Sequence, residues 1–308
     1  MKRTLLLALA AVLLAGCEHS ETELRIGASP WPGNAPVFLA ADDGRLGAGV
    51  RVVEFSSETA ALQAFRNRAL DVAVLTLDEA LLLAGEGHGV RIVALTDLSA
   101  GAGVMLARPP LGDVASLRGR RIGVESTGTG GFILAHALRL AGLAVADVQI
   151  VSLLPHEQAG EYAAGRIDVA VSHEPFAERL RALGARPVFD TRQMEDDLIR
   201  AVVVRDSRLN EHRRRVGELV RALLAGNAAF AGDAGLARAA RRYRQTPEEF
   251  RQAYAGVRPL TEADNRAYFA DDARRLRDVL AHVQDEMLEA RLIAAPVDLA
   301  KLPVGVLP

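Results

Sequence analysis

From residue 24 onward, short runs of apolar and β-branched residues alternate with stretches whose apolar positions recur at helical spacing. This pattern predicts strands at 24–29, 50–55, 71–75 and 90–96, and helices at 35–43, 58–68 and 78–85. Strands and helices that alternate at this spacing are typical of βαβ units, in which the strands form a mainly parallel sheet. The first part of the chain is therefore expected to form one α/β lobe.

The alternation of strands and helices is interrupted at residue 104 and resumes at residue 121. An extended stretch at 104–107 is followed by Arg108-Pro109-Pro110, and the prolines interrupt regular structure because they lack a backbone N–H. The second half then predicts strands at 121–125, 148–153, 168–172 and 187–189, and helices at 130–141, 156–165 and 174–183. We expect one crossing between two lobes at 105–110 and a return crossing at 200–205, in a strand at 199–204.

After Arg208 the pattern is helical almost to the end of the chain. Helices are predicted at 211–230, 233–243, 247–254 and 262–290. Their apolar positions are expected to pack on the first lobe, and charge runs such as 213–215 to face solvent. The sequence thus predicts an α/β fold of two Rossmann-like lobes with a helical C-terminal tail. The expected domains are 24–106 with 205–308 for the first lobe and 107–204 for the second.

One sequence pattern occurs in both halves. Residues 67–74 (NRALDVAV) and 164–171 (AGRIDVAV) each contain the end of a helix, an aspartate and a buried strand. A pattern that occurs only twice indicates two halves of similar architecture rather than an array of repeats.

The N-terminal residues have the order of a secretory signal. Lys2 and Arg3 precede an uncharged apolar run at 4–14, which is too short to span a bilayer, and small residues then precede Cys17. The segment LAGC at 14–17 resembles a bacterial lipobox. This resemblance implies a signal peptide at 1–16, an acylated Cys17, a tether at 17–23 and a lipid-anchored protein in the periplasm or on the cell surface. The alternative is an ordinary cleaved signal with an incidental cysteine.

Cysteine content and net charge limit the possible disulfides and the possible partners of the chain. Cys17 is the only cysteine among 308 residues, so an intramolecular disulfide is impossible. The formal charge of −2 becomes −4 once Lys2 and Arg3 are removed with the signal. Such a charge, without a basic cluster, argues against nucleic acid as a partner.

Three segments carry a family resemblance. They are WPGNAPVFLA at 31–40, LRGRRIGV at 117–124 and GRIDVAVSHEP at 165–175. In this order the chain resembles the solute-binding proteins of the nitrate/sulfonate/taurine and thiamine-pyrimidine-precursor transporters. The resemblance implies the type II periplasmic binding-protein fold, a solute cleft between the lobes, an ABC permease as partner and a monomeric state.

Candidate solute-binding residues follow from this architecture. In open parallel sheets, ligands bind beyond the carboxyl ends of the strands, where the N-termini of helices present free N–H groups. The residues selected at the predicted strand ends are Trp31, Thr76, Asp78, Asp97, Ser99, Glu125, Ser126, Thr127, Thr129, His173 and Glu174.

Trp31 and the turn at 125–131 are the most distinctive of these features. Trp31, the only tryptophan, can stack on a flat solute or cover a cation, or it can pack locally against the following helix. The turn ESTGTGG has hydroxyl and N–H groups that can hold a polar head group, or it can serve as a simple N-cap. It lacks the Lys-Ser/Thr of a P-loop and the glycine of a hydrolase nucleophile elbow.

The charges at the strand ends favour one solute class. Asp78, Asp97, Glu125 and Glu174 are all acidic, and the selected loops contain no Lys or Arg. Buried carboxylates need a positive partner or several N–H donors, so they favour an amine or an aminopyrimidine-like solute over nitrate or a sulfonate. The alternative is that they complement helix N-termini.

The sequence predicts no catalytic residue, cofactor or metal. The seven histidines, at 19, 88, 136, 156, 173, 212 and 282, show no metal-ligand spacing. The favoured function is solute capture for an ABC importer, and the alternative is a ligand-sensing co-receptor for a membrane signalling protein. An enzyme on the same fold would need a nucleophile, a metal or a cofactor lysine at the expected spacing.

Overall fold

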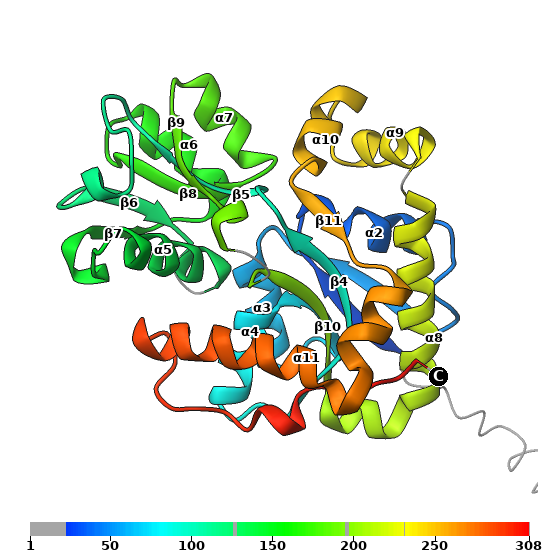
Figure 1. Cartoon of the computed structure of the whole chain (residues 1–308). Coiled ribbons are helices and arrows are strands. Elements are labelled where there is room, and N and C mark those ends of the chain that lie inside the picture. The colour runs from blue at the N-terminus through cyan, green and yellow to red at the C-terminus, as the bar shows by residue number, and fades with distance from the viewer. Residues whose placement is uncertain (1–22, 126–127, 195–196, 231, 308) are drawn as a thin grey trace, which may run out of the picture.

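The computed structural model describes residues 23–125, 128–194, 197–230 and 232–307. The signal segment, Cys17 and the candidate site residues Ser126 and Thr127 lie outside these ranges. The described residues form two α/β lobes, each with its own sheet (Figure 1). The two-lobed α/β fold that the sequence predicts is confirmed.

The first lobe is built on a six-stranded sheet in the order β11-β4-β10-β3-β1-β2. Its strands are β1 (Leu24–Ala28), β2 (Val50–Glu54), β3 (Val72–Thr76), β4 (Val90–Ser99), β10 (Ile199–Arg205) and β11 (Val257–Pro259). β1 runs parallel to β2 and β3, whereas β10 runs antiparallel to β3 and β4. β10 is thus inserted antiparallel between β3 and β4, and β11 also runs antiparallel to β4 at the edge of the sheet.

The second lobe has a five-stranded sheet in the order β7-β6-β8-β5-β9. Its strands are β5 (Gly103–Ala107), β6 (Arg121–Val124), β7 (Gln149–Ser152), β8 (Val169–His173) and β9 (Arg186–Asp190). β6 pairs in parallel with β7 and β8, and β5 pairs antiparallel with β8 and β9. The same topology thus occurs in both lobes, with one antiparallel strand inserted beside parallel ones.

Helices cover both sheets and begin near strand ends. In the first lobe these are α2 (Ala35–Asp42), α3 (Glu58–Arg66) and α4 (Leu77–Gly85); in the second they are α5 (Thr129–Leu140), α6 (Pro155–Ala163) and α7 (Phe176–Ala182). Ser57 caps α3 by accepting a hydrogen bond from the Ala60 N–H at 3.1 Å. Such caps fix where each helix begins, and therefore which residues face the junction of the lobes.

The sequence pattern shared by the two halves has a structural role. Asp71 accepts hydrogen bonds from the backbone N–H and the guanidinium of Arg25, at 3.0 and 3.1 Å. Asp168 makes the corresponding pair with Arg121 in the second lobe, both at 3.0 Å. In each lobe the aspartate therefore fastens the start of one strand to its parallel neighbour.

The positions of the crossings correct the prediction. β4 stays in the first sheet as far as Ser99, and β5 enters the second sheet at Gly103, so the first crossing lies at 100–102 rather than at 105–110. The return crossing lies between Met194 and Ile199, not at 200–205, because β10 already belongs to the first sheet. Residues 103–106 therefore belong to the second lobe and 199–204 to the first.

The C-terminal tail wraps the first lobe. It consists of α8 (Asp206–Phe230), α9 (Asp233–Arg242), α10 (Pro247–Tyr254) and α11 (Glu262–Glu289). It is not helical throughout, since β11 adds an edge strand to β4 that the sequence pattern did not predict. Gly256 lies against the first crossing, where an added Cβ would come within 2.4 Å of the Ala102 nitrogen. In Figure 1, α11 runs beneath both lobes.

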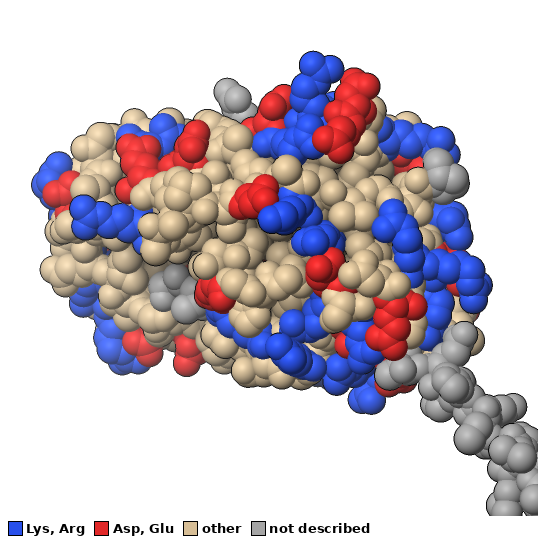
Figure 2. All heavy atoms as spheres, turned by 90° about the horizontal axis from the view of Figure 1, so that it is seen from below, with Lys and Arg blue, Asp and Glu red and all other residues tan. Residues whose placement is uncertain are grey.

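Arginines of the tail take part in packing. Figure 2 shows positive and negative side chains interspersed over one face of the molecule, without a broad area of one sign. Arg238 pairs with Asp43 at 2.6 Å, and Arg242 pairs with Glu54 at 2.7 Å. Arg215, expected to face solvent, is buried and donates to the carbonyl of Gly49 at 2.9 Å. These contacts fasten the tail to the first lobe.

Asn265 joins α11 to the edge of the first sheet. Its Oδ1 accepts a hydrogen bond from the Leu95 N–H at 2.7 Å, and its Nδ2 donates to the Leu95 carbonyl at 2.9 Å. The side chain is 1% exposed, so both backbone groups of Leu95 depend on it for hydrogen bonding in the core.

We expect Asn265→Ala to lower the free energy of unfolding by roughly 2–4 kcal/mol, because it leaves a buried N–H and a buried carbonyl without partners. Urea unfolding followed by circular dichroism measures this change. Arg266→Ala, at an exposed position of the same helix, is the control and should change the free energy by less than about 0.5 kcal/mol. Equal effects of the two variants would contradict this role of Asn265.

Candidate functional site

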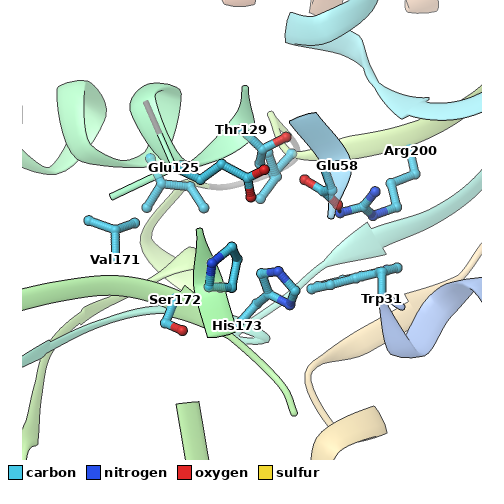
Figure 3. A pocket seen from close by; sticks show the side chains of 13 residues that line it. Trp31, Glu58, Glu125, Thr129, Val171, Ser172, His173 and Arg200 are labelled. Carbon is cyan, nitrogen blue, oxygen red and sulfur yellow. Dashed lines mark hydrogen bonds and ion pairs between the residues drawn. The ribbon is translucent and has the colours of Figure 1, made fainter. Parts of the chain in front are cut away.

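A cavity lies at the junction of the two lobes. Its polar and aromatic lining consists of Trp31, Glu58, Glu125, Thr129, Ser172, His173 and Arg200 (Figure 3). Apolar side chains such as Ile133, Val171 and Leu198 complete the wall. The cavity volume is about 30 Å³, which holds one or two water molecules and no larger solute. The lobes must therefore separate before a solute can enter.

Arg200 is the charged centre of this site. It lies near the start of β10, and only 4% of its side chain is exposed. It forms an ion pair with Glu58 at the start of α3, and its Nε lies 3.9 Å from Asp97 Oδ1. Burial raises the pKa of Glu58, but Arg200 and His173 outweigh burial and hold that pKa below its ordinary value. The cationic guanidinium is therefore matched by an ionised Glu58.

Trp31 covers the guanidinium. Its ring lies 4.4 Å from Arg200 Cζ, and its Nε1 donates to Asp97 Oδ1 at 2.8 Å. Such cation–π contact stabilises a desolvated guanidinium. Burial raises the pKa of Asp97, opposed by Arg200 and by the Trp31 N–H. Trp31 thus lines the cavity, as the sequence suggested, while Asp97 lies behind it and does not.

The second lobe faces this group with Glu125 and Thr129. Glu125 Oε1 accepts a hydrogen bond from the Thr59 N–H at 2.9 Å, across the lobe junction. Thr129 lies between Glu125 and Glu58 in Figure 3, and its hydroxyl lies 2.8 Å from that of Thr76. Glu125 and Thr129 therefore line the cavity and also join the lobes, whereas Thr76 only joins them.

Two further carboxyl groups are buried beneath the cavity. Asp78 and Glu79, in the first turn of α4, are 3% and 0% exposed. Burial raises the pKa of Asp78 to about 7. Burial and the neighbouring carboxylates Glu58 and Asp78 raise the pKa of Glu79 well above its ordinary value. Asp78 does not line the cavity, and its position fits the alternative that it starts a helix.

Ser99 and Glu174 have structural partners. Ser99 Oγ, at the end of β4 just before the first crossing, lies 2.8 Å from Thr191 Oγ1, which precedes the return crossing, so this hydrogen bond joins residues that flank the two crossings. Glu174 Oε2 accepts from the Glu178 N–H at 3.1 Å, and Oε1 pairs with Arg181, so Glu174 fastens the start of α7. Neither residue lines the cavity.

His173 ends β8 at the cavity wall. Its Nδ1 lies 2.8 Å from the Glu174 carbonyl, and its ring meets Trp31 edge-on at 5.7 Å between centroids. The adjacent Ser172 hydroxyl is buried and has no hydrogen-bond partner among the described residues. Both side chains are therefore available to a solute.

Sequence reasoning missed Glu58 and Arg200. The selected strand ends contain no Lys or Arg, because Arg200 lies inside the apolar run IRAVVV of an antiparallel strand. An arginine in such a run signals a buried charge that needs a carboxylate partner. Arg200 Nη1 has no hydrogen-bond partner among the described residues, so it too can bind a solute.

Comparison with known proteins places this site in a family context. The sequence matches the NMT1-like family over residues 18–242. No curated protein matches the chain in sequence.

The structure is similar to several solved proteins. The alkanesulfonate-binding protein SsuA from Xanthomonas axonopodis pv. citri, bound to MOPS, matches with a TM-score of 0.78 and 19% identity, over 92% of this chain and 98% of that one. The aliphatic sulphonate binding protein SsuA from Escherichia coli matches with a TM-score of 0.72 and 17% identity, over 92% of each chain. The desulfurization enzyme DSZB matches with a TM-score of 0.64 and 21% identity, over 92% and 97%. At these identities the likeness shows the fold, which binding proteins and an enzyme share.

We expect Asp78 to make stability depend on pH. The carboxyl titrates near 4 in an unfolded chain and near 7 in the folded protein, so between these values only the folded protein keeps the proton. The contribution of Asp78 to the free energy of unfolding should therefore fall as the pH rises from about 4 to 7, and Glu79 acts in the same direction. Asp78→Asn should flatten this fall and be more stable than the parent above about pH 7.

Urea unfolding at several pH values measures this dependence. Asp278→Asn, at an exposed position of α11, is the control and should keep the parent profile. A parent protein whose stability rises between about pH 4 and 7, unchanged by Asp78→Asn, would contradict the assignment.

Proposed function

The chain belongs to the NMT1-like family, and from this premise we propose that it is an extracytoplasmic solute-binding protein that delivers a small amino-bearing solute to an ABC importer. The two-lobed fold, with polar side chains from both lobes around one cavity, supports solute capture. The likeness to SsuA binding proteins supports the same role.

The charged groups around the cavity are the basis for the solute class that we propose. Glu58 already neutralises Arg200, and Glu125 adds a second carboxylate from the opposite lobe. A sulfonate or nitrate would face two carboxylates against one paired guanidinium. A solute with N–H donors satisfies both carboxylates instead, which favours an amine-type group.

The remaining polar groups favour a solute that also has acceptors. Arg200 Nη1 is a buried donor without a hydrogen-bond partner among the described residues, and the Ser172 hydroxyl can donate as well. A simple amine would leave this donor unpaired, whereas an amino-heterocycle offers ring nitrogens as acceptors beside its N–H donors. Trp31 and His173 supply an aromatic wall for a flat ring.

Solute entry requires a hinge between the lobes. The first crossing at 100–102 and the return crossing before Ile199 are the covalent connections between the two sheets. Their joining by Ser99 and Thr191 supports a shared pivot for both. Closure around the solute is the change that a permease would recognise.

We propose no catalytic role for this site. The described residues contain no cysteine, and Ser172 Oγ has no hydrogen bond to a base among them. His173 Nδ1 faces a backbone carbonyl rather than a hydroxyl group. Among the described residues, no hydroxyl group of the cavity is therefore hydrogen-bonded to a base in the way that nucleophilic catalysis needs.

The proposed location is outside the cytoplasm, with Cys17 as the lipid attachment point. Within the described ranges, the structure contains no helix with the length and apolar character of a membrane span. Lipid attachment is tested by mass spectrometry of the protein from its native membrane, which should show an acylated N-terminal Cys17.

We expect amino-heterocycles to stabilise the purified protein most in a thermal-shift screen, small amines to stabilise it less, and sulfonates and nitrate to have no effect. A solute at a hundredfold excess over its Kd adds about 2.7 kcal/mol. Glu125→Gln should weaken binding of the active solute at least tenfold, since it removes one carboxylate partner.

Glu178→Gln is the matched control, because Glu178 is exposed in the same lobe and does not line the cavity. It should leave the affinity unchanged. Stabilisation by sulfonates alone, with Glu125→Gln neutral, would overturn the proposed solute class. A chain that no panel member stabilises would overturn the solute-binding assignment for these classes.

A further inference from the structure

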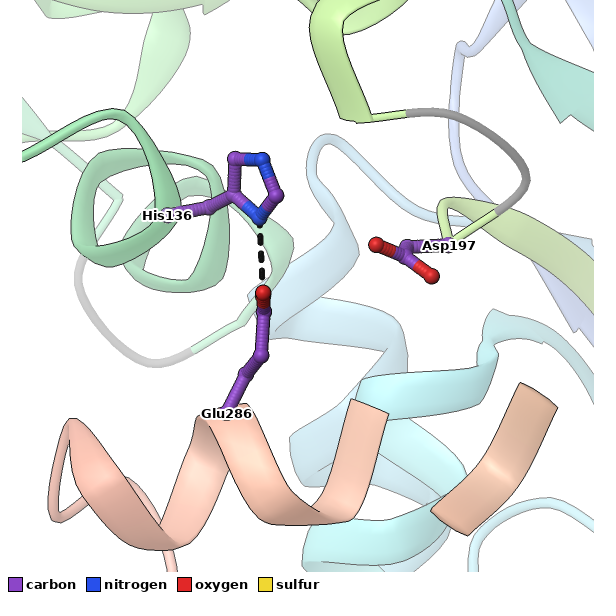
Figure 4. Close-up of side chains that lie close together, drawn as sticks. All are labelled: His136, Asp197 and Glu286. Atoms are coloured by element: carbon purple, nitrogen blue, oxygen red, sulfur yellow. Dashed lines mark hydrogen bonds and ion pairs between the residues drawn. The ribbon is translucent and has the colours of Figure 1, made fainter. Parts of the chain in front are cut away.

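A second polar cluster lies behind the cavity wall. His136 on α5, Asp197 in the return crossing and Glu286 on α11 place one ligand atom each within 4.8 Å of the others (Figure 4). All three residues are less than 9% exposed. They come from the second lobe, the crossing and the tail on the first lobe. Spacing along the chain could not predict this cluster, because His136 and Glu286 are 150 positions apart.

A second histidine completes the cluster. His282, one turn before Glu286 on α11, places its Nε2 3.3 Å from Asp197 Oδ2 and 3.7 Å from Glu286 Oε1. His136 Nδ1 lies 2.8 Å from Glu286 Oε2. Two imidazoles and two carboxylates thus face one another within ion-pairing distance.

We propose that His136, Asp197, His282 and Glu286 bind one divalent transition-metal ion of the zinc type. Zinc sites are usually four-coordinate and tetrahedral, and histidine nitrogens and carboxylate oxygens are among the ligands they use. Bonds of about 2.0–2.1 Å then separate neighbouring ligand atoms by about 3.3–3.4 Å. Two pairs of proposed ligand atoms, His136 Nδ1 with Glu286 Oε2 and His282 Nε2 with Asp197 Oδ2, lie 2.8 and 3.3 Å apart, close to this value. Two carboxylates also balance the charge of a divalent ion.

The surroundings fit a metal site. Arg139, one turn after His136, bonds to Glu286 Oε1 and leaves Oε2 for the ion. Metal-bound carboxylates are commonly held by such outer hydrogen bonds, which orient them. Half of the His282 side chain is exposed, at 58%, which gives an ion a path from solvent. Phe189 packs near the His136 ring at 6.2 Å and restricts its rotation.

The site connects to the solute cavity without sharing a residue with it. Asp197 precedes Leu198, and His136 lies one turn after Ile133; both Leu198 and Ile133 line the cavity. An ion bound here would join α5 to α11 and therefore favour the closed arrangement of the lobes.

The experiment titrates the chelator-treated protein with Zn²⁺ by calorimetry and with Co²⁺ by visible absorption, both without solute. We expect one ion per chain, a Kd in the micromolar range or tighter, and the intense absorption of four-coordinate Co²⁺. His282→Ala should weaken binding at least tenfold. This variant removes a half-exposed side chain, so it should fold even if His136→Ala does not, and circular dichroism checks folding of both.

His156→Ala is the matched control, since His156 is exposed and far from the cluster in sequence. It should leave the Zn²⁺ affinity unchanged. Binding no tighter than millimolar, a weak six-coordinate Co²⁺ spectrum, or equal effects of His282→Ala and His156→Ala would overturn the proposal. Because no solute is present, the result does not depend on the proposed transport function.

Discussion

The burial of one guanidinium organises the first lobe. A fully desolvated Arg200 would be unfavourable by several kcal/mol if it stood alone in the apolar strand β10. The chain meets this constraint with Glu58, with the face of Trp31 and with Asp97. These three residues come from α3, β4 and the loop after β1, so the positions of all three segments depend on the same charge.

The second lobe contributes differently. It supplies Glu125, Thr129 and His173 but no buried cation among the cavity residues that the structure describes. Its contacts to the first lobe include hydrogen bonds between Thr129 and Thr76 and between Glu125 and Thr59. The first lobe therefore contains the buried ion pair, while the second lobe contributes Thr129, His173 and one carboxylate to the cavity.

Periodicity predicted most elements because their apolar faces are buried against regular sheets. Residues 72–76 and 169–173 form buried strands where the pattern placed them. β11 was missed because three residues, Val-Arg-Pro, are too short to show alternation. The crossings were misplaced because strand pairing, not local sequence, decides that residue 103 joins the second sheet.

The site was predicted only where it follows strand ends. Trp31, Glu125, Thr129 and His173 line the cavity, as the rule for parallel sheets predicts. Arg200 lies on an antiparallel strand, to which this rule does not apply. Asp78 and Glu174 obey the rule but serve helix starts, and sequence cannot distinguish a carboxylate that caps a helix from one that faces a cleft.

The hydrogen bonds between the lobes have a consequence for affinity. The pairs Thr76–Thr129 and Thr59–Glu125 stabilise the closed form even without a solute. An open, solute-accepting population must break them, and a ligand must then repay that energy from its own contacts. In the proposed solute-binding role, the balance between open and closed forms of the empty protein therefore contributes to the apparent dissociation constant. The same balance sets the fraction of empty protein molecules that are already closed. A permease that recognises the closed form would therefore also encounter closed molecules without solute.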